Sequence, residues 1–279
     1  MAGSGEGRLE GGRRVRGTST AAVPLISIIT AVYNGAGSME RTIASVIGQT
    51  FSSFEYIIID GGSDDGTTEL LERYDESVDY WVSEPDNGIY DALNKGITLS
   101  RGEWLYFLGS DDAFIDPHLL EKVFSEKRDT KLLYGDVLYG DTGALYGGTF
   151  TRLRLTKRNI CQQGIFYHAD LFQTLGPFDT KYPLLADWLF NMKVFSLKES
   201  RPEHVDIVVA EYSLAGASSR TPDPVFARDW LPMIRKYLGI PCYLYALSSH
   251  LQDQVAANCR KYIARPVARL FRLTKDIGR

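Results

Sequence analysis

The sequence predicts an α/β protein with a mostly parallel, doubly wound β-sheet that carries helices on both faces. Three observations lead to this fold class: apolar runs of strand length, segments with helical apolar spacing between them, and polar clusters directly after the strands. Strands that alternate with helices over residues 25–138 are typical of parallel sheets. Such sheets bind ligands beyond the carboxyl ends of their strands, so we expect a functional site at that edge.

Each element follows from a local pattern. Strand segments are short and rich in β-branched or aromatic residues, whereas helical segments repeat apolar residues every three or four positions. The expected strands span residues 25–32, 54–60, 80–82 and 103–108, and the expected helices span residues 39–47, 68–74, 89–99 and 116–124. Ser38 stands where a helix cap belongs.

The two ends of the chain differ from the region between them. Residues 1–23 contain six glycines and four arginines without an apolar run, which predicts a disordered leader rather than a signal peptide. We expect one main domain over residues 24–220 and a helical C-terminal extension over residues 221–279. Three cysteines without paired spacing favour free thiols and a reducing, cytoplasmic location. No stretch approaches the roughly 18 apolar residues that a membrane-spanning helix needs.

Charge is distributed unevenly along the chain. Residues 24–253 carry 20 basic and 32 acidic side chains, which argues against a nucleic-acid partner, because such binding depends on neutralising phosphates. Residues 254–279 carry seven basic and one acidic side chain. Helical spacing there forms an apolar face of Val267, Leu270, Phe271 and Thr274 and a basic side of Arg265, Arg269, Arg272 and Lys275. This pattern predicts peripheral contact with an anionic membrane. The alternative is a helix that packs on the body or on a second subunit of a homo-oligomer.

Polar clusters follow three of the expected strands. They span residues 30–34 and 60–65 and include the adjacent carboxylates Asp111 and Asp112. Neighbouring carboxylates repel each other and are costly to dehydrate unless a cation or a set of donors is present. Ordinary turn chemistry with an Asp helix cap is the alternative for this pair. Three polar strand ends on one edge favour a binding site over three unrelated turns.

The loop at residues 34–40 mimics a dinucleotide-binding loop, with Asp60 in the place of a ribose-binding acid. The third glycine position, however, is Glu40, whose charge and bulk suit neither helix–sheet packing nor a nearby pyrophosphate. A Walker P-loop is absent from the sequence. The loop therefore disfavours an NAD-type dehydrogenase.

Eight motifs follow one another along the chain: ISIITAVYN (26–34), FEYIIIDGGSDDGT (54–67), SEPDNGIYDALNKG (83–96), RGEWLYFLGSDD (101–112), YGD (134–136), KRNICQQGIFYHADLF (157–172), LGPFD (175–179) and LLADWLF (184–190). In this order the chain resembles the family 2 inverting glycosyltransferases of the GT-A fold, especially bacterial enzymes that decorate glycolipids and surface polysaccharides. The resemblance covers about residues 25–220. It implies a nucleotide-sugar half over residues 24–138 and an acceptor half over residues 139–220.

The resemblance marks donor-binding positions in the first half. They are Thr30, Tyr33, Asn34, Asp60, Asn94, Lys95 and Asp111. The implied donor is a nucleotide-diphosphate sugar, of the UDP type, with Asp60 at the base and Lys95 offsetting the diphosphate charge. A strand-end turn for Asp60 and an exposed helical lysine for Lys95 are the structural alternatives.

The family's metal motif also ends in two aspartates at the close of a strand. Asp112 is therefore the expected ligand of a divalent ion, and Asp111 a contact of the ribose or of the metal shell. Carboxylates suit Mg²⁺ or Mn²⁺, which also take donor phosphate oxygens and would neutralise the leaving diphosphate. Many relatives carry an acid two residues before the pair, where this chain has Gly109. We therefore expect weak metal affinity in the absence of the nucleotide.

Asp187 matches the family's general base. Its apolar neighbours should raise its pKa by desolvation, and a helix start there would lower it. A plain helix cap is the alternative for Asp187. Leu189 stands where relatives often have a second acid, which leaves Asp187 as the carboxylate candidate of this motif. On the acceptor side the resemblance marks Gln163 and Trp188, and a core position is the alternative for Trp188.

The sequence thus predicts a metal-dependent inverting glycosyltransferase that moves a sugar from a nucleotide-diphosphate sugar to a hydroxyl of a glycolipid or saccharide acceptor. A sugar nucleotidyltransferase is one alternative, but it would need a glycine-rich, basic loop after the first strand, and Tyr33-Asn34-Gly35 is not one. A non-catalytic sugar-nucleotide-binding protein is the other, because acids are missing at Gly109 and Leu189.

Overall fold

The computed structural model describes residues 8–18, 23–140, 142–213 and 221–259. Its strands are β1 (Leu9–Gly11), β2 (Ile26–Val32), β3 (Phe54–Asp60), β4 (Tyr80–Ser83), β5 (Trp104–Phe107), β6 (Ala113–Phe114), β7 (Leu132–Tyr139), β8 (Ala144–Tyr146), β9 (Ile165–His168) and β10 (Glu203–Tyr212). Its α-helices are α1 (Met39–Ile47), α2 (Thr67–Arg73), α3 (Ile89–Leu99), α4 (Leu119–Phe124), α5 (Arg152–Leu155), α6 (Asp170–Leu175), α7 (Ala186–Ser196), α9 (Pro224–Met233) and α10 (Ile240–Cys259). Shorter turns of other helix types are η1 (Gln162–Gly164), η2 (Lys198–Ser200) and η3 (Ile234–Leu238).

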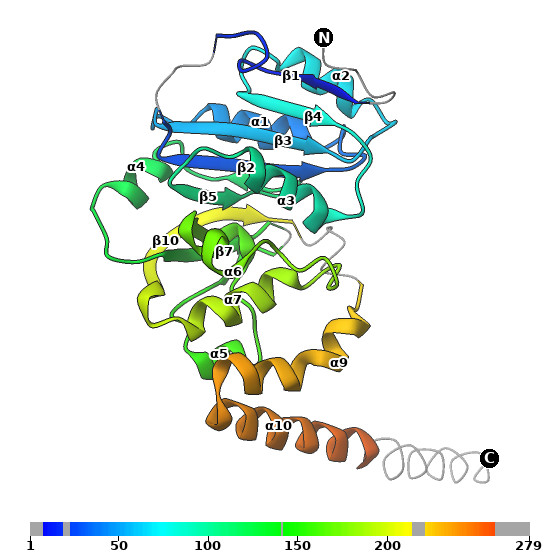
Figure 1. The fold of residues 1–279 in the computed structure, drawn as a ribbon, viewed down its shortest axis with the longest axis vertical. Helices are drawn as coiled ribbons and strands as arrows, with labels where there is room; N and C mark the ends of the chain where they lie inside the picture. The colour runs from blue at the N-terminus through cyan, green and yellow to red at the C-terminus, as the bar shows by residue number, and fades with distance from the viewer. Residues whose placement is uncertain (1–7, 19–22, 141, 214–220, 260–279) are drawn as a thin grey trace, which may run out of the picture.

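One sheet of ten strands joins these elements across the described residues, in the order β1-β4-β3-β2-β5-β9-β7-β10-β6, with β8 paired to β7. β4, β3, β2 and β5 run parallel, which confirms the parallel sheet predicted for the first half of the chain. β9 runs antiparallel to both β5 and β7, so β7 and its parallel neighbour β10 run in the same direction as the first four strands. Figure 1 shows the strands stacked from β1 and β4 at the top to β7 and β10 below.

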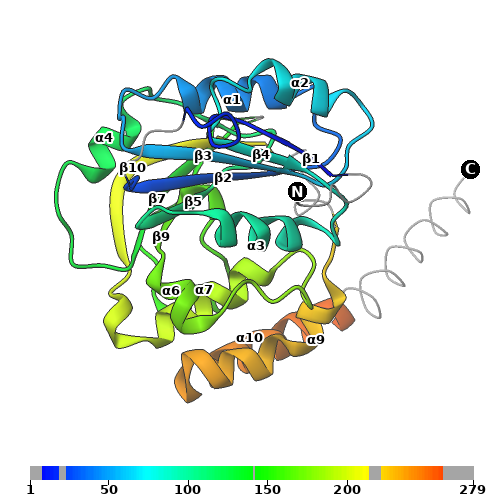
Figure 2. The ribbon, with the colours of Figure 1, turned by 45° about the horizontal axis from the view of Figure 1, so that its top comes forward.

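Helices cover both faces of the sheet (Figure 2). α1 and α2 lie over one face, and α3, α6 and α7 lie over the other, with α9 and α10 beyond them. Successive side chains of a strand point to opposite faces. Ile28 therefore joins the core beneath α1 and α2, whereas Ile29 joins the core beneath α3 and α7. Because both faces are buried, the strands are apolar on both sides, which explains the unbroken apolar runs in the sequence.

The C-terminal helices extend the second of these cores. Phe226 of α9 and Cys242 and Ala246 of α10 are buried against it. None of the helices in the described part of the chain is long and apolar enough to span a bilayer. The amphipathic pattern predicted at residues 265–275 lies outside the described residues.

The N-terminal segment corrects the prediction of a disordered leader over residues 1–23. In its described part, β1 pairs antiparallel with β4 at one edge of the sheet. The arginines that suggested a leader are ion-pair partners: Arg13 lies 2.9 Å from Asp79, and Arg14 pairs with the buried Glu55. Local composition could not show this, because the acidic partners lie far along the chain, in β3 and in the segment before β4.

Two predicted helix starts also differ in detail. Ser38 occupies the N-cap position of α1, but its side chain makes no capping hydrogen bond. α4 begins at Leu119 rather than at residue 116, because Asp116 instead accepts the backbone N–H of His118 at 2.9 Å in the preceding turn.

Candidate active site

The loops after β2 and β3 are tied together at the carboxyl edge of the parallel strands. The backbone N–H of Asn34 donates to Ser63 Oγ at 2.7 Å, and Asn34 Oδ1 accepts the backbone N–H of Asp64 at 3.1 Å. Asn34 has a φ of 52°, a left-handed conformation that Asn adopts more readily than most residues. The neighbouring ring of Tyr33 is 67% exposed. This edge therefore presents an open aromatic ring beside two linked loops.

Thr30 and Asp60 do not reach the surface of this edge. Thr30 is fully buried, and its hydroxyl lies 3.1 Å from the hydroxyl of Tyr56. Asp60 is also fully buried and accepts the backbone N–H of Ser63 at 3.0 Å and the hydroxyl of Ser83 at 2.6 Å. Both side chains are thus directed into the protein, which a position near a strand end does not reveal. A donor contact of Thr30 and Asp60 stays a prediction.

The two predicted residues of α3 are both engaged with the protein. Asn94 Nδ2 donates to the carbonyl of Phe178, and Asn94 Oδ1 accepts the N–H of Phe178, both at 2.9 Å. Both halves of the amide therefore brace the loop after α6, and a donor contact of Asn94 stays a prediction. Lys95 Nζ lies 3.0 Å from the carboxylate of Glu84 and donates to the carbonyl of Pro85 at 3.1 Å. A donor contact of Lys95 stays a prediction.

The adjacent carboxylates after β5 have different surroundings. Asp111 is partly exposed, whereas Asp112 is 1% exposed. Asp112 Oδ1 accepts the backbone N–H of Ser213 at 2.8 Å, while Oδ2 is buried without a hydrogen-bond partner among the described residues. Burial, together with the charge of Asp111, raises the pKa of Asp112 to about 7. An unpartnered, buried carboxylate oxygen is costly, and a hard divalent cation is the natural partner for it.

Gly109 makes room for this carboxylate. A Cβ atom at Gly109 would lie 2.3 Å from Asp112 Oδ2, so any side chain there would displace it. The residues described by the structure contain no group of three or more His, Cys, Asp or Glu side chains suited to a metal ion. Asp111 and Asp112 therefore fit a metal that takes its remaining ligands from phosphate oxygens and water, consistent with weak affinity in the absence of the nucleotide.

Asp187 lies in the first turn of α7, one position after Ala186, and the N-cap residue is Leu185. Its carboxylate is 7% exposed and accepts two short hydrogen bonds, from Tyr90 Oη at 2.6 Å and from Asn159 Nδ2 at 2.5 Å. Burial raises the pKa of Asp187 to about 6, and the two donors limit that rise. A carboxylate with this pKa can accept a proton near neutral pH, as a general base must.

A chain of amides holds this carboxylate in place. Asn159 Oδ1 accepts Asn191 Nδ2 at 2.8 Å, and Asn191 Oδ1 accepts the hydroxyl of Tyr167 at 2.9 Å. The network fixes which end of Asn159 faces Asp187. Sequence reasoning missed the roles of Tyr90, Asn159 and Asn191. Tyr90 and Asn159 stand inside the motifs quoted above, but nothing in their spacing shows that they converge on one carboxylate.

Cys161 and Gln163 connect the two acids. Cys161 Sγ donates to Gln163 Oε1 at 3.1 Å. Burial raises the pKa of the thiol, and the charges of Asp112 and Asp187 both add to the rise. The side chain of Gln163 in turn lowers the pKa of Asp112 without completing a hydrogen bond to Oδ2. Gln163 therefore lies close to Asp112, and Cys161 lies within the electrostatic reach of both acids.

Trp188 packs into the protein rather than toward a ligand. Its indole N–H donates to the carbonyl of Leu155 at 2.8 Å, and its ring stacks on Phe226 with centroids 5.3 Å apart. The structure thus favours the core alternative for Trp188 over the predicted acceptor contact.

Comparison with known proteins decides the family. Residues 27–170 match the model of "Glycosyl transferase family 2". A "PGL/p-HBAD biosynthesis glycosyltransferase" of Mycobacterium bovis BCG is 38% identical over 207 residues, which cover 72% of this chain and 81% of that protein. The chain belongs to glycosyltransferase family 2. The resemblance inferred from the eight motifs is thereby confirmed, and the chain is a glycosyltransferase.

Solved structures confirm the GT-A fold of this family 2 glycosyltransferase. S. aureus TarS 1–349, solved in complex with UDP, has a TM-score of 0.61 at 16% identity and matches 76% of this chain and 64% of that one, just under two thirds of its length. The mannosyltransferase PcManGT from Pyrobaculum calidifontis, solved with GDP-Man and Mn²⁺, has a TM-score of 0.57 at 16% identity and matches 88% of this chain and 83% of that one.

Proposed function

We propose that this family 2 glycosyltransferase is metal-dependent and inverting, and that it moves a sugar from a nucleotide-diphosphate sugar to a hydroxyl of a glycolipid or saccharide acceptor. One observation carries the proposal. Two buried carboxylates that both act electrostatically on Cys161 have opposite environments: Asp112 has an unpartnered oxygen, and Asp187 has both oxygens held by hydrogen bonds.

Asp112 Oδ2 and Asp111 would hold the divalent ion. When bound, Mn²⁺ or Mg²⁺ would supply Lewis-acid stabilisation of the charge that develops on the leaving diphosphate. The N–H of Ser213 keeps Oδ1 turned away from that role, since it already occupies this oxygen at 2.8 Å. Donor affinity should therefore depend on the metal, because the protein and the diphosphate each supply part of its ligand set.

Asp187 would take the proton of the acceptor hydroxyl while that oxygen attacks the anomeric carbon. The hydrogen bonds from Tyr90 and Asn159 fix the carboxylate in one orientation and keep its pKa from rising further. A base held in this way typically contributes about 10²–10⁴-fold in rate. A single displacement by the acceptor oxygen inverts the anomeric configuration.

Tyr33 and Asn34 provide the open surface for the donor nucleotide. The exposed ring of Tyr33 can stack on a base, and the loops linked through Asn34 line the same edge. TarS was solved with UDP and PcManGT with GDP-Man, and these bound ligands support a nucleotide-sugar donor. We retain a UDP-type donor as the proposal, with Lys95 near the diphosphate.

The acceptor class rests on the relative named for PGL/p-HBAD biosynthesis and on the C-terminal end of the chain. Ile240, Leu244 and Leu251 of α10 expose more than half of their surfaces. With the seven basic residues of 254–279, this composition suits peripheral contact with an anionic membrane. Deletion of residues 254–279 should release the protein from phosphatidylglycerol vesicles without changing its affinity for UDP. Equal co-sedimentation of both forms would contradict the membrane contact.

The proposal is tested by a screen of nucleotide sugars with Mn²⁺, followed by product analysis. A donor present at 100 times its Kd should stabilise the protein by about 2.7 kcal/mol, which a thermal shift detects. The donor identified in this way should be turned over with Mn²⁺ and not with EDTA, and NMR should show a product of inverted anomeric configuration. A retained anomer would overturn the mechanism, and full turnover in EDTA would overturn the metal dependence.

A further inference from the structure

Three tyrosine rings, which we call the tyrosine cluster, meet at the edge of the second half of the sheet. Tyr139 of β7 contacts Tyr146 of β8, with centroids 5.6 Å apart and planes inclined at 30°, and Tyr212 of β10, with centroids 5.8 Å apart. All three side chains are partly exposed. Tyr56 and Tyr106, by contrast, are fully buried in the core. The tyrosine cluster is therefore a partly exposed aromatic surface, and Tyr146 joins it to the core beneath.

Strand pairing explains how the cluster forms. Tyr139 is directly opposite Tyr212 in the parallel pair of β7 and β10. Tyr146 pairs with Val137, two residues before Tyr139, so the two tyrosines are diagonal neighbours on one face of the sheet. Three strands thus contribute one ring each to the same surface.

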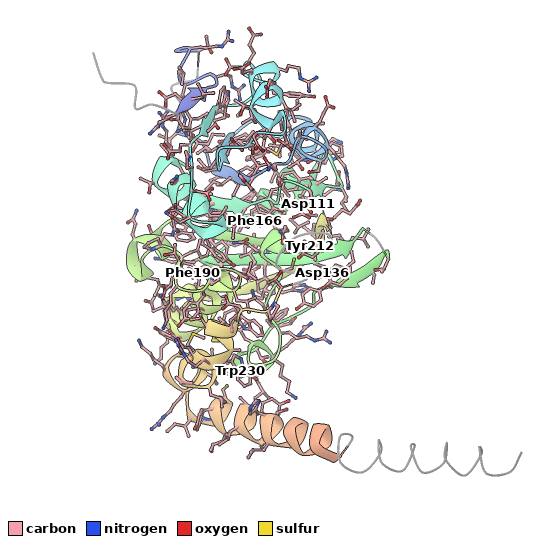
Figure 3. All side chains as sticks on the ribbon, turned by 90° about the vertical axis from the view of Figure 1, so that its right-hand side faces the viewer. Asp111, Asp136, Phe166, Phe190, Tyr212 and Trp230 are labelled. Carbon is pink, nitrogen blue, oxygen red and sulfur yellow. The ribbon has the colours of Figure 1, made fainter. Side chains whose placement is uncertain are left out.

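The cluster is linked to a neighbour of each of the two functional acids. The hydroxyl of Tyr146 donates to the carbonyl of Asn159, whose side chain holds Asp187. At the other end, Tyr212 directly precedes Ser213, whose N–H binds Asp112. Figure 3 shows Asp111, Tyr212 and Asp136 one below another along the part of the molecule that faces the viewer.

Electrostatics supports this placement. Burial raises the pKa of Tyr146, and the charge of Asp187 adds to the rise. Burial also raises the pKa of Tyr139 to about 12, while the charge of the exposed Arg158 acts in the opposite direction. Arg158 has the same effect on Tyr146. The guanidinium of Arg158 therefore lies within electrostatic reach of both rings.

We propose that the tyrosine cluster is the acceptor subsite and that it binds a pyranose ring by its apolar C–H face. The inference rests on the proposed function and assigns its acceptor class. A pyranose has one face of axial C–H groups, which packs on aromatic rings, and hydroxyls at its edge, which Arg158 can bind through its N–H groups. Placed on Tyr139 and Tyr146, such a sugar would direct a hydroxyl toward Asp187.

Saturation-transfer NMR tests the subsite. The probes are methyl pyranosides of glucose, galactose, mannose and rhamnose, together with phenyl β-D-glucopyranoside, added to the full chain with UDP and diamagnetic Mg²⁺. At least one methyl pyranoside should receive saturation at its ring C–H protons. Tyr139→Ala should weaken its Kd by about tenfold, and Tyr139→Phe should retain the affinity because the ring remains.

The matched control is Tyr237→Ala, which removes a partly buried tyrosine of η3 outside the cluster. It should bind the pyranoside as the native protein does. Absence of saturation transfer in the native protein, equal affinity of Tyr139→Ala and native protein, or transfer to the phenyl protons alone would each overturn the sugar subsite. UDP affinity, measured by calorimetry on the same samples, tests the proposed function separately, because the tyrosine cluster should not alter it.

Discussion

Asp60 ends β3 and Asp112 follows β5, the two strands on either side of β2, and both residues are almost completely buried. Their partners differ. Asp60 accepts hydrogen bonds from Ser63 and Ser83, whereas Asp112 has one oxygen bound to Ser213 and one with no partner among the described residues. The comparison teaches that a buried carboxylate with its oxygens satisfied stabilises a turn. A buried carboxylate with one oxygen that lacks a partner instead destabilises the fold until a cation binds to that oxygen.

Asp187 extends the comparison to a third buried acid. Its oxygens are both bound, as in Asp60, yet burial still raises its pKa to about 6. Its partners are a phenol and an amide that also belong to a wider network. Partner chemistry therefore separates three environments: the oxygens of Asp60 hold a turn, Asp112 is suited to a metal, and Asp187 is suited to proton transfer.

The largest expected effect is on catalysis. Asp187→Asn keeps the size of the side chain but cannot accept the proton, so transfer should fall by roughly two to four orders of magnitude. Affinity for nucleotide and metal should stay near native, because the base acts only in the transition state. Steady-state kinetics and calorimetry on the same variant measure the two quantities.

Asp170→Asn is the matched control, because it also removes an acid from the first turn of a helix, in this case α6. It should leave transfer unchanged. Near-native transfer by Asp187→Asn would show that the base is another residue.

The next effect is on the free energy of unfolding, which should change in opposite directions when Asp60 and Asp112 are replaced by Asn. Asp60→Asn should destabilise the protein by about 1–3 kcal/mol, because the new amide would face the donors of Ser63 and Ser83. Asp112→Asn should instead stabilise the metal-free protein at pH 8. Urea unfolding in EDTA measures both free energies.

The sign follows from the raised pKa of Asp112, about 7 in the folded protein. A folded state that binds the proton more tightly than the unfolded chain loses stability as pH rises from about 4 to about 7, by about 4 kcal/mol at most. Asp112→Asn removes that loss, so its advantage should grow between pH 4.5 and pH 8. If the free energies of unfolding of the variant and of the native protein changed with pH in parallel, the buried environment assigned to Asp112 would be contradicted.

The smallest effect concerns the donor to Asp187. Tyr90→Phe removes a hydrogen bond that lowers the pKa of this carboxylate. Activity requires the ionised base, so the acid limb of the pH–rate profile should move to higher pH, by about one unit. Tyr134→Phe, which alters a tyrosine hydroxyl bound to the backbone of Phe150, should leave the profile in place. A profile of Tyr90→Phe that coincides with the native one would contradict this role.

The first half of the fold could be predicted because its signals are local. Strands such as β2 and β3 are buried on both faces and therefore appear as continuous apolar runs, and α3 begins and ends as predicted, at Ile89 and Leu99. The second half could not be assigned in this way. β9 and β7 are neighbours in an antiparallel pair with many residues between them in the chain, and β8 is three residues long.

The sequence predicted which residues belong to the site, but it did not predict their hydrogen-bond partners. Asp112 and Asp187 were found because their motifs resemble those of the family. The burial of Thr30 and Asp60 could not be predicted, because the hydrogen-bond partner of each one, Tyr56 or Ser83, lies on another strand. The orphaned oxygen of Asp112 could not be predicted at all, since it depends on the absence of a partner in three dimensions.

The central claim is that Asp112 Oδ2 holds a divalent ion together with the donor diphosphate. Calorimetric titration of UDP and of GDP, each with Mn²⁺ and with EDTA, tests it most directly in the native protein and in Asp112→Asn. We predict that the nucleotide that binds does so at least about tenfold more tightly with Mn²⁺ in the native protein, and that this difference disappears in Asp112→Asn. Equal affinity with Mn²⁺ and with EDTA in the native protein would contradict the claim.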